Sequence, residues 1–196
     1  MTRQGSTQNL VLGSSSPRRR DLLARIGVEP ARIASPDIDE TPVAGEKPRG
    51  YALRMAQEKA AAIARGADEI ILAGDTTVAL GSRILPPADT EAVQRELLGK
   101  LSGRRHHVWS SVCVIDHGGR ARSRISKSIL RFKRLGPDEI DAYVASGEGL
   151  GKAGGYAIQG RAEALIDWMS GSHSGVIGLP LYETRALLRS SGYDIA

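Results

Sequence analysis

Serine and arginine residues follow the first apolar run of the chain, where a strand is expected to turn into a helix. Residues 10–12 predict a buried strand, and Ser16 followed by Pro17 is typical of a helix N-cap and first helical position. Backbone N–H groups and the positive end of the helix dipole meet at such a point. Arg18 and Arg19 add two cations suited to bidentate phosphate contacts. The segment predicts a phosphate site; the alternative is a serine that only caps and arginines that are only solvated.

A lysine interrupts the apolar face of an expected helix over residues 48–65. With ~100° between successive residues, the apolar face consists of Ala52, Met55, Ala56, Ala60 and Ile63. Lys59 falls in the middle of this face. Because burying an unpaired charge is costly, Lys59 must either extend its ammonium to water or find an anion.

Asp75 comes directly after the apolar run 70–74, which should lie in the protein interior. A carboxylate at the end of such a strand is usually a metal ligand, a general base or a cap for the next turn. Thr76 adds a hydroxyl beside it. The sequence leaves these alternatives open.

Glu40, with Asp37 and Asp39, forms a second group of carboxylates in a loop bracketed by prolines. Hard cations such as Mg²⁺ bind carboxylate and phosphate oxygens. The alternative is that these charges are only solvated.

A glycine-rich stretch over residues 151–160 lets a ligand approach the backbone closely. Lys152 adds a cation there, and Gln159 offers both a donor and an acceptor to a base edge or a ribose. A flexible surface loop is the alternative. The tandem His106 and His107 have no third ligand at a recognisable spacing, so we expect them to pack or hydrogen-bond within a strand.

The positions of these residues follow from an alternation of strands and helices that predicts an α/β fold. Strands are expected at 10–12, 32–35, 69–73 with 77–80 as a continuation, 107–116 paired with 124–132, 165–169 and 175–177. Helices are expected at 17–26, 48–65, from an Asp89 cap to 101, from 137 onward, and over 180–189. Residues 102–136 could form a smaller second lobe of a single unit covering residues 1–196.

The bulk composition narrows the class of protein. The chain has 196 residues, 41% of them hydrophobic, and a net charge of +5 that favours anionic partners. Only 4% of the residues are aromatic, too few for base-stacking platforms, so we expect no nucleic acid partner. No apolar run approaches the ~20 residues that span a bilayer. The single Cys113 and the absence of an export signal are typical of the cytoplasm.

Taken together in chain order, these segments resemble the Maf family of nucleoside triphosphate pyrophosphatases. The matching pieces are Ser14-Ser15-Ser16-Pro17-Arg18-Arg19, Asp39-Glu40, Glu58-Lys59-Ala60, Gly74-Asp75-Thr76, Leu101-Ser102-Gly103, Tyr143 to Gly147, Gly151 to Gly160 and Val176 to Leu181. The form of the glycine-rich stretch resembles the branch that acts on dTTP and UTP.

The resemblance implies an elongated, two-lobed Maf/ITPase-like fold, a mixed sheet flanked by helices with the active-site cleft between the lobes. It implies a homodimer and a Mg²⁺- or Mn²⁺-dependent cut between the α- and β-phosphates of a nucleoside triphosphate. The resemblance implies that Asp75 is the general base and that Glu40 and Asp75 bind the metal. It implies that Arg18, Arg19 and Lys59 bind the triphosphate, with Ser14 and Ser16 at the turn. It also implies that Thr76 and Gln159 contribute to the choice of base and that Lys152 supports the pocket.

One departure from the family pattern concerns a lysine that commonly follows the aspartate strand. The position here is Pro87, which carries no charge and no N–H, although Arg83 is close in sequence. A milder change is Ser110, where threonine is usual. The departure at Pro87 favours an alternative function, a nucleotide-sensing or cell-division-regulating binding protein with little turnover.

Overall fold

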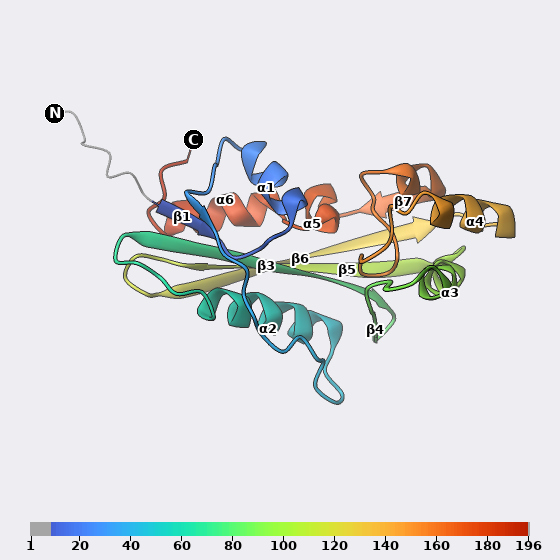
Figure 1. The fold of residues 1–196 in the computed structure, drawn as a ribbon, viewed down its shortest axis with the longest axis horizontal. Helices are drawn as coiled ribbons and strands as arrows, with labels where there is room; N and C mark the ends of the chain where they lie inside the picture. The colour runs from blue at the N-terminus through green and yellow to red at the C-terminus, as the bar shows by residue number, and fades with distance from the viewer. Residues whose placement is uncertain (1–8, 196) are drawn as a thin grey trace.

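The computed structural model describes residues 9–195, in which a seven-stranded mixed sheet runs along an elongated molecule (Figure 1). The strands are β1 (Asn9–Leu12), β2 (Arg32–Ile33), β3 (Glu69–Leu80), β4 (Arg83–Leu85), β5 (Arg105–Ile115), β6 (Ala121–Phe132) and β7 (Ile166–Ser170). Their order is β2-β1-β3-β5-β6-β7, with β4 paired to β3. The first three strands are mutually parallel and the other pairings are antiparallel, so the predicted α/β class is confirmed.

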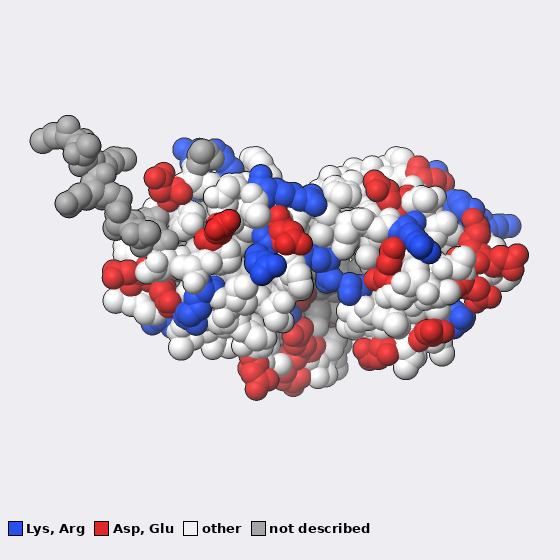
Figure 2. Space-filling view, turned by 45° about the horizontal axis from the view of Figure 1, so that its top comes forward, with Lys and Arg blue, Asp and Glu red and all other residues white. Residues whose placement is uncertain are grey.

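Helices lie on both faces of this sheet. They are α1 (Pro17–Ala24), α2 (Pro48–Ala61), α3 (Glu91–Leu101), α4 (Pro137–Ala145), α5 (His173–Ile177) and α6 (Leu181–Ser190), with a 3₁₀ turn at Arg161–Leu165. Helix α2 covers one face, whereas α1, α5 and α6 cover the other (Figure 1). Helices α3 and α4 pack together at the end of the molecule far from β1. Between the two halves the surface is hollowed, and Lys and Arg side chains gather along the hollow (Figure 2).

The alternation of side chains along β3 divides the core in two. Ile71 and Ala73 face α2 and pack with Ala56, Ala60 and Cys113 in a small cluster. The alternate residues of β3, such as Leu72, face α1 and α6 and belong to the larger cluster. Asp75 follows the period of Ala73 and therefore points toward α2.

Several predicted boundaries need correction. The stretch 175–177 is not a strand but the end of α5, since Ser172 accepts a hydrogen bond from the Gly175 N–H and starts a helix. A short apolar run does not distinguish the two states. Thr90, and not Asp89, caps α3, through a 3.2 Å bond from the Val93 N–H. Helix α2 ends at residue 61, short of the predicted 65.

The hairpin predicted around residues 116–119 is confirmed, with all of β5 paired to residues 121–131 of β6. Residues 102–136 contribute these two strands to the shared sheet, and the division of the chain into lobes stays a prediction. No helix within residues 9–195 combines the length and apolar character needed to cross a membrane.

Candidate active site

Two carboxylates converge on one ammonium between α2 and the sheet. Lys59 Nζ lies 2.9 Å from Asp75 Oδ1 and 2.7 Å from Glu40 Oε2. The side chains of Lys59 and Asp75 are 10% and 9% exposed, whereas that of Glu40 is 54% exposed. Lys59 has therefore found anions and does not extend to water, which decides between the two alternatives that the sequence left open.

Asp75 lies in the middle of β3, and not at the end of a strand as expected. The continuous strand brings Thr77 to the same face, where its hydroxyl donates to Asp75 Oδ2 over 2.8 Å. Both carboxylate oxygens are thus hydrogen-bonded. Gly74 is required beside it, because a Cβ there would lie 2.9 Å from the Ser111 carbonyl oxygen on β5.

The serine turn between β1 and α1 is organised around Arg19. The guanidinium donates to the Gly178 carbonyl and to Ser14 Oγ, each over 2.9 Å. Ser14 Oγ also accepts the Ser16 N–H over 3.2 Å, and Ser16 occupies the N-cap position without a side-chain cap bond. Burial lowers the pKa of Arg19, while the charges of Asp75 and Glu40 act in the opposite direction. These hydrogen bonds hold the turn in place, and its arginines present positive charge to the adjoining cavities.

A cavity of about 190 Å³, here called the central cavity, opens between this turn and the glycine-rich stretch. It is lined by Ser16, Arg18, Arg19, Asp75, Thr76, Val78, Pro87, Gly151, Lys152, Ala153, Tyr156, Ala157, Gln159, Val176, Ile177 and Gly178. Burial lowers the pKa of Arg18, and burial and the charge of Arg18 lower that of Lys152. Within residues 9–195 no ion pair joins either cation to a carboxylate. The cavity thus presents cations suited to an anionic ligand.

Two further cavities flank the central one and share its walls. Arg18 and Arg19 also line a serine-turn cavity that contains Glu40 and Lys59. Asp75 and Thr76 also line an α2-side cavity that contains Glu40, Pro42, Tyr51, Thr77 and Pro87. Asp75 is therefore accessible from the central cavity and from the side of α2.

The structure brings the ten predicted site residues to one region. Glu40, Lys59 and Asp75 form the ionic cluster, while Thr76, Lys152 and Gln159 line the central cavity. The remaining four form the serine turn: Ser14, Ser16, Arg18 and Arg19. Their individual roles stay predictions.

Tyr51 is a residue of this region that the sequence analysis did not identify. Its hydroxyl donates to the Glu40 carbonyl over 2.8 Å, and burial together with the charges of Asp75 and Glu40 raises its pKa to about 12. The available signal was helical spacing, since Tyr51 and Lys59 lie eight residues apart on one face of α2.

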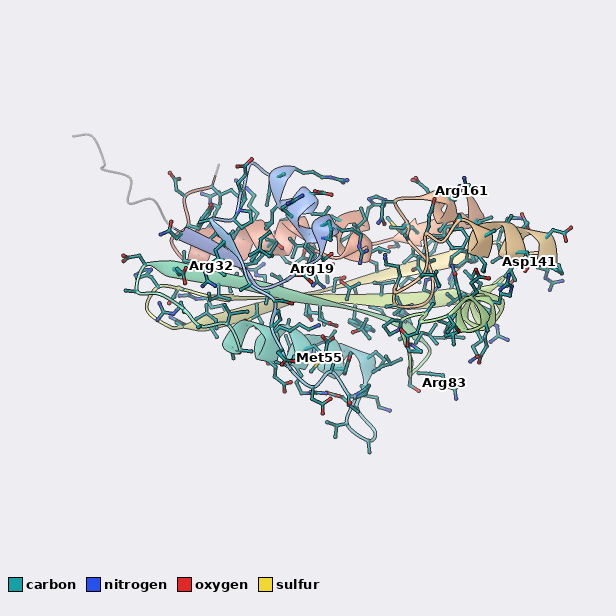
Figure 3. All side chains as sticks on the ribbon, viewed as in Figure 1. Arg19, Arg32, Met55, Arg83, Asp141 and Arg161 are labelled. Carbon is teal, nitrogen blue, oxygen red and sulfur yellow. The ribbon has the colours of Figure 1, made fainter. Side chains whose placement is uncertain are left out.

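The segment around Pro87 borders the site without supplying a charge. Pro87 pairs with Ala153 in an isolated bridge, and the Ala88 N–H donates to the Lys152 carbonyl over 3.1 Å. Arg83 begins β4 at the outer edge of the molecule (Figure 3), and it is absent from the walls of the three cavities described here.

The donor set fits a hard divalent cation. Asp75 and Glu40 offer carboxylate oxygens, although residues 9–195 contain no group of three or more His, Cys, Asp and Glu that could hold a metal ion. Mg²⁺ commonly takes one or two carboxylates and completes its shell with water and phosphate oxygens. Two carboxylates beside the cationic turn are consistent with this preference.

Comparison with known proteins identifies the family of the chain. A Sphingopyxis alaskensis protein named dTTP/UTP pyrophosphatase is 66% identical over 186 residues, 95% of this chain and 98% of its own. A Novosphingobium aromaticivorans protein of the same name is 59% identical over 95% of this chain and 93% of its own. A HAM1 protein structure from Coxiella burnetii shares the fold, with a TM-score of 0.50 and 16% identity over 93% of this chain and 98% of that one. The family model described as Maf-like protein matches residues 9–191, so the chain belongs to the Maf family.

Proposed function

We propose that the protein is a nucleoside triphosphate pyrophosphatase that converts dTTP and UTP to the monophosphate and pyrophosphate. The observation that carries the proposal is that Arg18, Arg19, Lys152 and the Asp75 carboxylate line a single cavity. The names of the two relatives, which share most of their length with this chain, support the choice of dTTP and UTP.

The cavities suggest how a nucleotide lies in the site. The base and sugar occupy the end of the central cavity near Thr76 and Gln159, and Lys152 closes that pocket. The phosphate chain passes Arg18 and Arg19 toward Lys59, where the serine-turn cavity holds the leaving pyrophosphate. This path brings the bond between the α- and β-phosphates beside Asp75.

Asp75 takes the proton of the attacking water in this proposal. Its Oδ2 is held by Thr77 and its Oδ1 by Lys59, so the carboxylate is oriented before substrate arrives. The cations of the turn stabilise charge that develops on the phosphate oxygens. Asp75 and Glu40 would hold Mg²⁺ or Mn²⁺, which supplies charge neutralisation and polarisation of the phosphoryl group.

The deciding experiment is product analysis with purified protein, dTTP and Mg²⁺ or Mn²⁺. We expect dTMP and pyrophosphate in equal amounts, and in ¹⁸O-labelled water the label in dTMP. Release of inorganic phosphate with dTDP would contradict the proposed bond. A panel of canonical triphosphates, 5-methyl-UTP and 7-methyl-GTP then ranks the substrates.

A second candidate is a nucleotide-binding regulator with little turnover. It is favoured by Pro87, which lines two of the cavities where the family commonly has a lysine. Calorimetry separates the candidates, because tight dTTP binding without turnover in saturating Mn²⁺ supports the regulator. The homodimer and the cytoplasmic location belong to the proposal as well, and sedimentation at several concentrations tests the dimer.

A further inference from the structure

The acidic loop, residues 34–47, carries Glu40 to the site without a helix or strand of its own. The Glu40 side chain is 54% exposed and its carboxylate meets the Lys59 ammonium at 2.7 Å. A flexible lysine stem and a half-exposed carboxylate do not by themselves set a position. The place of Glu40 relative to Asp75 therefore depends on how the acidic loop is attached.

Two side chains of α2 attach the backbone of this loop. The Tyr51 hydroxyl donates to the Glu40 carbonyl over 2.8 Å, and Arg54 donates to the Thr41 carbonyl over 3.2 Å. Three residues apart on the helix, the two side chains are neighbours, and the Arg54 guanidinium carbon lies 5.6 Å from the Tyr51 ring centroid. Both anchors act on the peptide groups next to the Glu40 side chain.

Arg54 also fixes the far end of the loop. Its guanidinium makes two bonds to the Glu46 carboxylate, at 2.7 and 2.8 Å. The same carboxylate accepts the Val43 N–H over 3.1 Å. The acidic loop is thus held on α2 at residues 40, 41 and 46, and α2 is the helix that presents Lys59.

We propose that Tyr51 is a positioning residue for Glu40, with Arg54 as the second anchor, and that together they hold Glu40 near Asp75, where the two carboxylates would hold a divalent cation. The part concerning the cation rests on the proposed function. The hydroxyl is engaged by the loop, so Tyr51 acts through Glu40.

The test compares Tyr51→Phe, which removes only the hydroxyl, with Tyr182→Phe as a matched control. Tyr182 is 78% exposed and lies on α6, on the opposite face of the sheet from α2. Backbone hydrogen exchange over residues 37–46 reports the loop directly and without metal or nucleotide. The Mn²⁺ concentration for half-maximal dTTP turnover reports the cation. Arg54→Gln provides a second variant that tests the other anchor.

For Tyr51→Phe we expect faster exchange in residues 37–46, unchanged exchange in β3, and a half-maximal Mn²⁺ concentration raised about three- to tenfold, the effect of one lost hydrogen bond. Saturating Mn²⁺ should restore kcat, a rescue that a general loss of structure does not give. The control should behave as the unmodified protein, and Arg54→Gln should change in the same direction as Tyr51→Phe.

Unchanged exchange in the acidic loop would overturn the proposal, as would a loss of kcat that saturating Mn²⁺ leaves in place. These results are distinguishable from a failure of the proposed function. If the unmodified protein releases no pyrophosphate from dTTP, the exchange measurement still decides whether Tyr51 holds the loop.

Discussion

Lys59 Nζ on α2 lies 2.9 Å from Asp75 Oδ1 in the middle of β3, and both side chains are nearly buried. The pair joins the helix to the strand, with Asp75 lining the central and α2-side cavities and Lys59 lining the serine-turn cavity. Because each charge depends on the other for compensation, changing either residue affects both stability and the site.

The first prediction concerns Asp75→Asn, which keeps the shape of the side chain and removes its charge. We expect kcat to fall by about 10²–10⁴-fold, because the amide cannot accept the proton of water. The free energy of unfolding should fall by only about 1–3 kcal/mol, since Lys59 retains Glu40. Asp141→Asn, at an exposed ion pair on α4, serves as the control. Near-normal kcat in a destabilised Asp75→Asn would remove Asp75 from the mechanism.

Lys59→Met should lower the free energy of unfolding by about 3–5 kcal/mol, because it leaves the Asp75 carboxylate buried without its counter-ion. Mn²⁺ should raise the melting temperature of this variant more than that of the unmodified protein, since a cation replaces the ammonium. Lys100→Met, which breaks an exposed pair with Glu96, should cost only about 0.3–0.5 kcal/mol. Equal Mn²⁺ effects on all three proteins would contradict the expectation.

Arg19→Lys should reduce kcat/KM for dTTP by about ten- to hundredfold, the loss of hydrogen bonds to a charged group. A lysine has no planar fork, so it cannot hold Ser14 Oγ and the Gly178 carbonyl together as Arg19 does. The neighbouring Arg20→Lys, on an exposed residue of the same helix, is the matched control. Steady-state kinetics with both variants decide whether the geometry or only the charge of Arg19 matters.

Pro87→Lys tests the departure from the family pattern. Neither the Ala88 N–H bond to Lys152 nor the Gly154 N–H bond to Pro86 involves the Pro87 nitrogen, so the local pairing should survive. We expect kcat/KM to rise about tenfold, because the new ammonium adds a charge-assisted contact to phosphate. Pro87→Gln, which removes the ring without adding charge, should give no gain. No gain from Pro87→Lys would mean that another cation already fills the role.

The fifth prediction concerns pH and a buried histidine. Burial, with a smaller effect of the charge of His107, lowers the pKa of His106 to about 4. The native state then binds fewer protons than the unfolded state between about pH 6.5 and 4, so stability falls as the pH drops through this range. The loss is about 3 kcal/mol at most, and none is expected from His106 above pH 7.

His106→Gln should reduce this loss of stability at acid pH. The glutamine still offers a partner to the Tyr156 hydroxyl, which lies 2.7 Å from His106 Nε2. Denaturant midpoints at pH 7, 6, 5 and 4.5 measure the effect. The control is His117→Gln, in the exposed turn between β5 and β6, which should lose as much stability at acid pH as the unmodified protein. If His106→Gln loses as much stability at acid pH as the unmodified protein, the acid sensitivity comes from other groups.

Local pattern in the sequence was enough to predict much of the fold and to single out residues that the structure brings into one region. The β5–β6 hairpin follows from paired runs and an Asp-His-Gly-Gly turn, and the apolar face of α2 follows from helical spacing. The same spacing marked Lys59 as a charge on an apolar face, which either extends to water or finds an anion, and the structure decided for the anion. These inferences succeeded because periodicity and turn chemistry act over a few residues.

Tertiary packing decided what those residues touch. Arg19 meets Gly178 across 159 positions of the chain, and Lys59 meets Glu40 across 19 and Asp75 across 16. Such pairs depend on the register of β3 beneath α2 and on the path of the acidic loop, which no local pattern encodes. For the same reason, the hydrogen bond from the Tyr51 hydroxyl to a backbone carbonyl could not be predicted from side-chain types. The sequence thus determined which groups are present, and the packing of α2 and α5 on one sheet determined their distances.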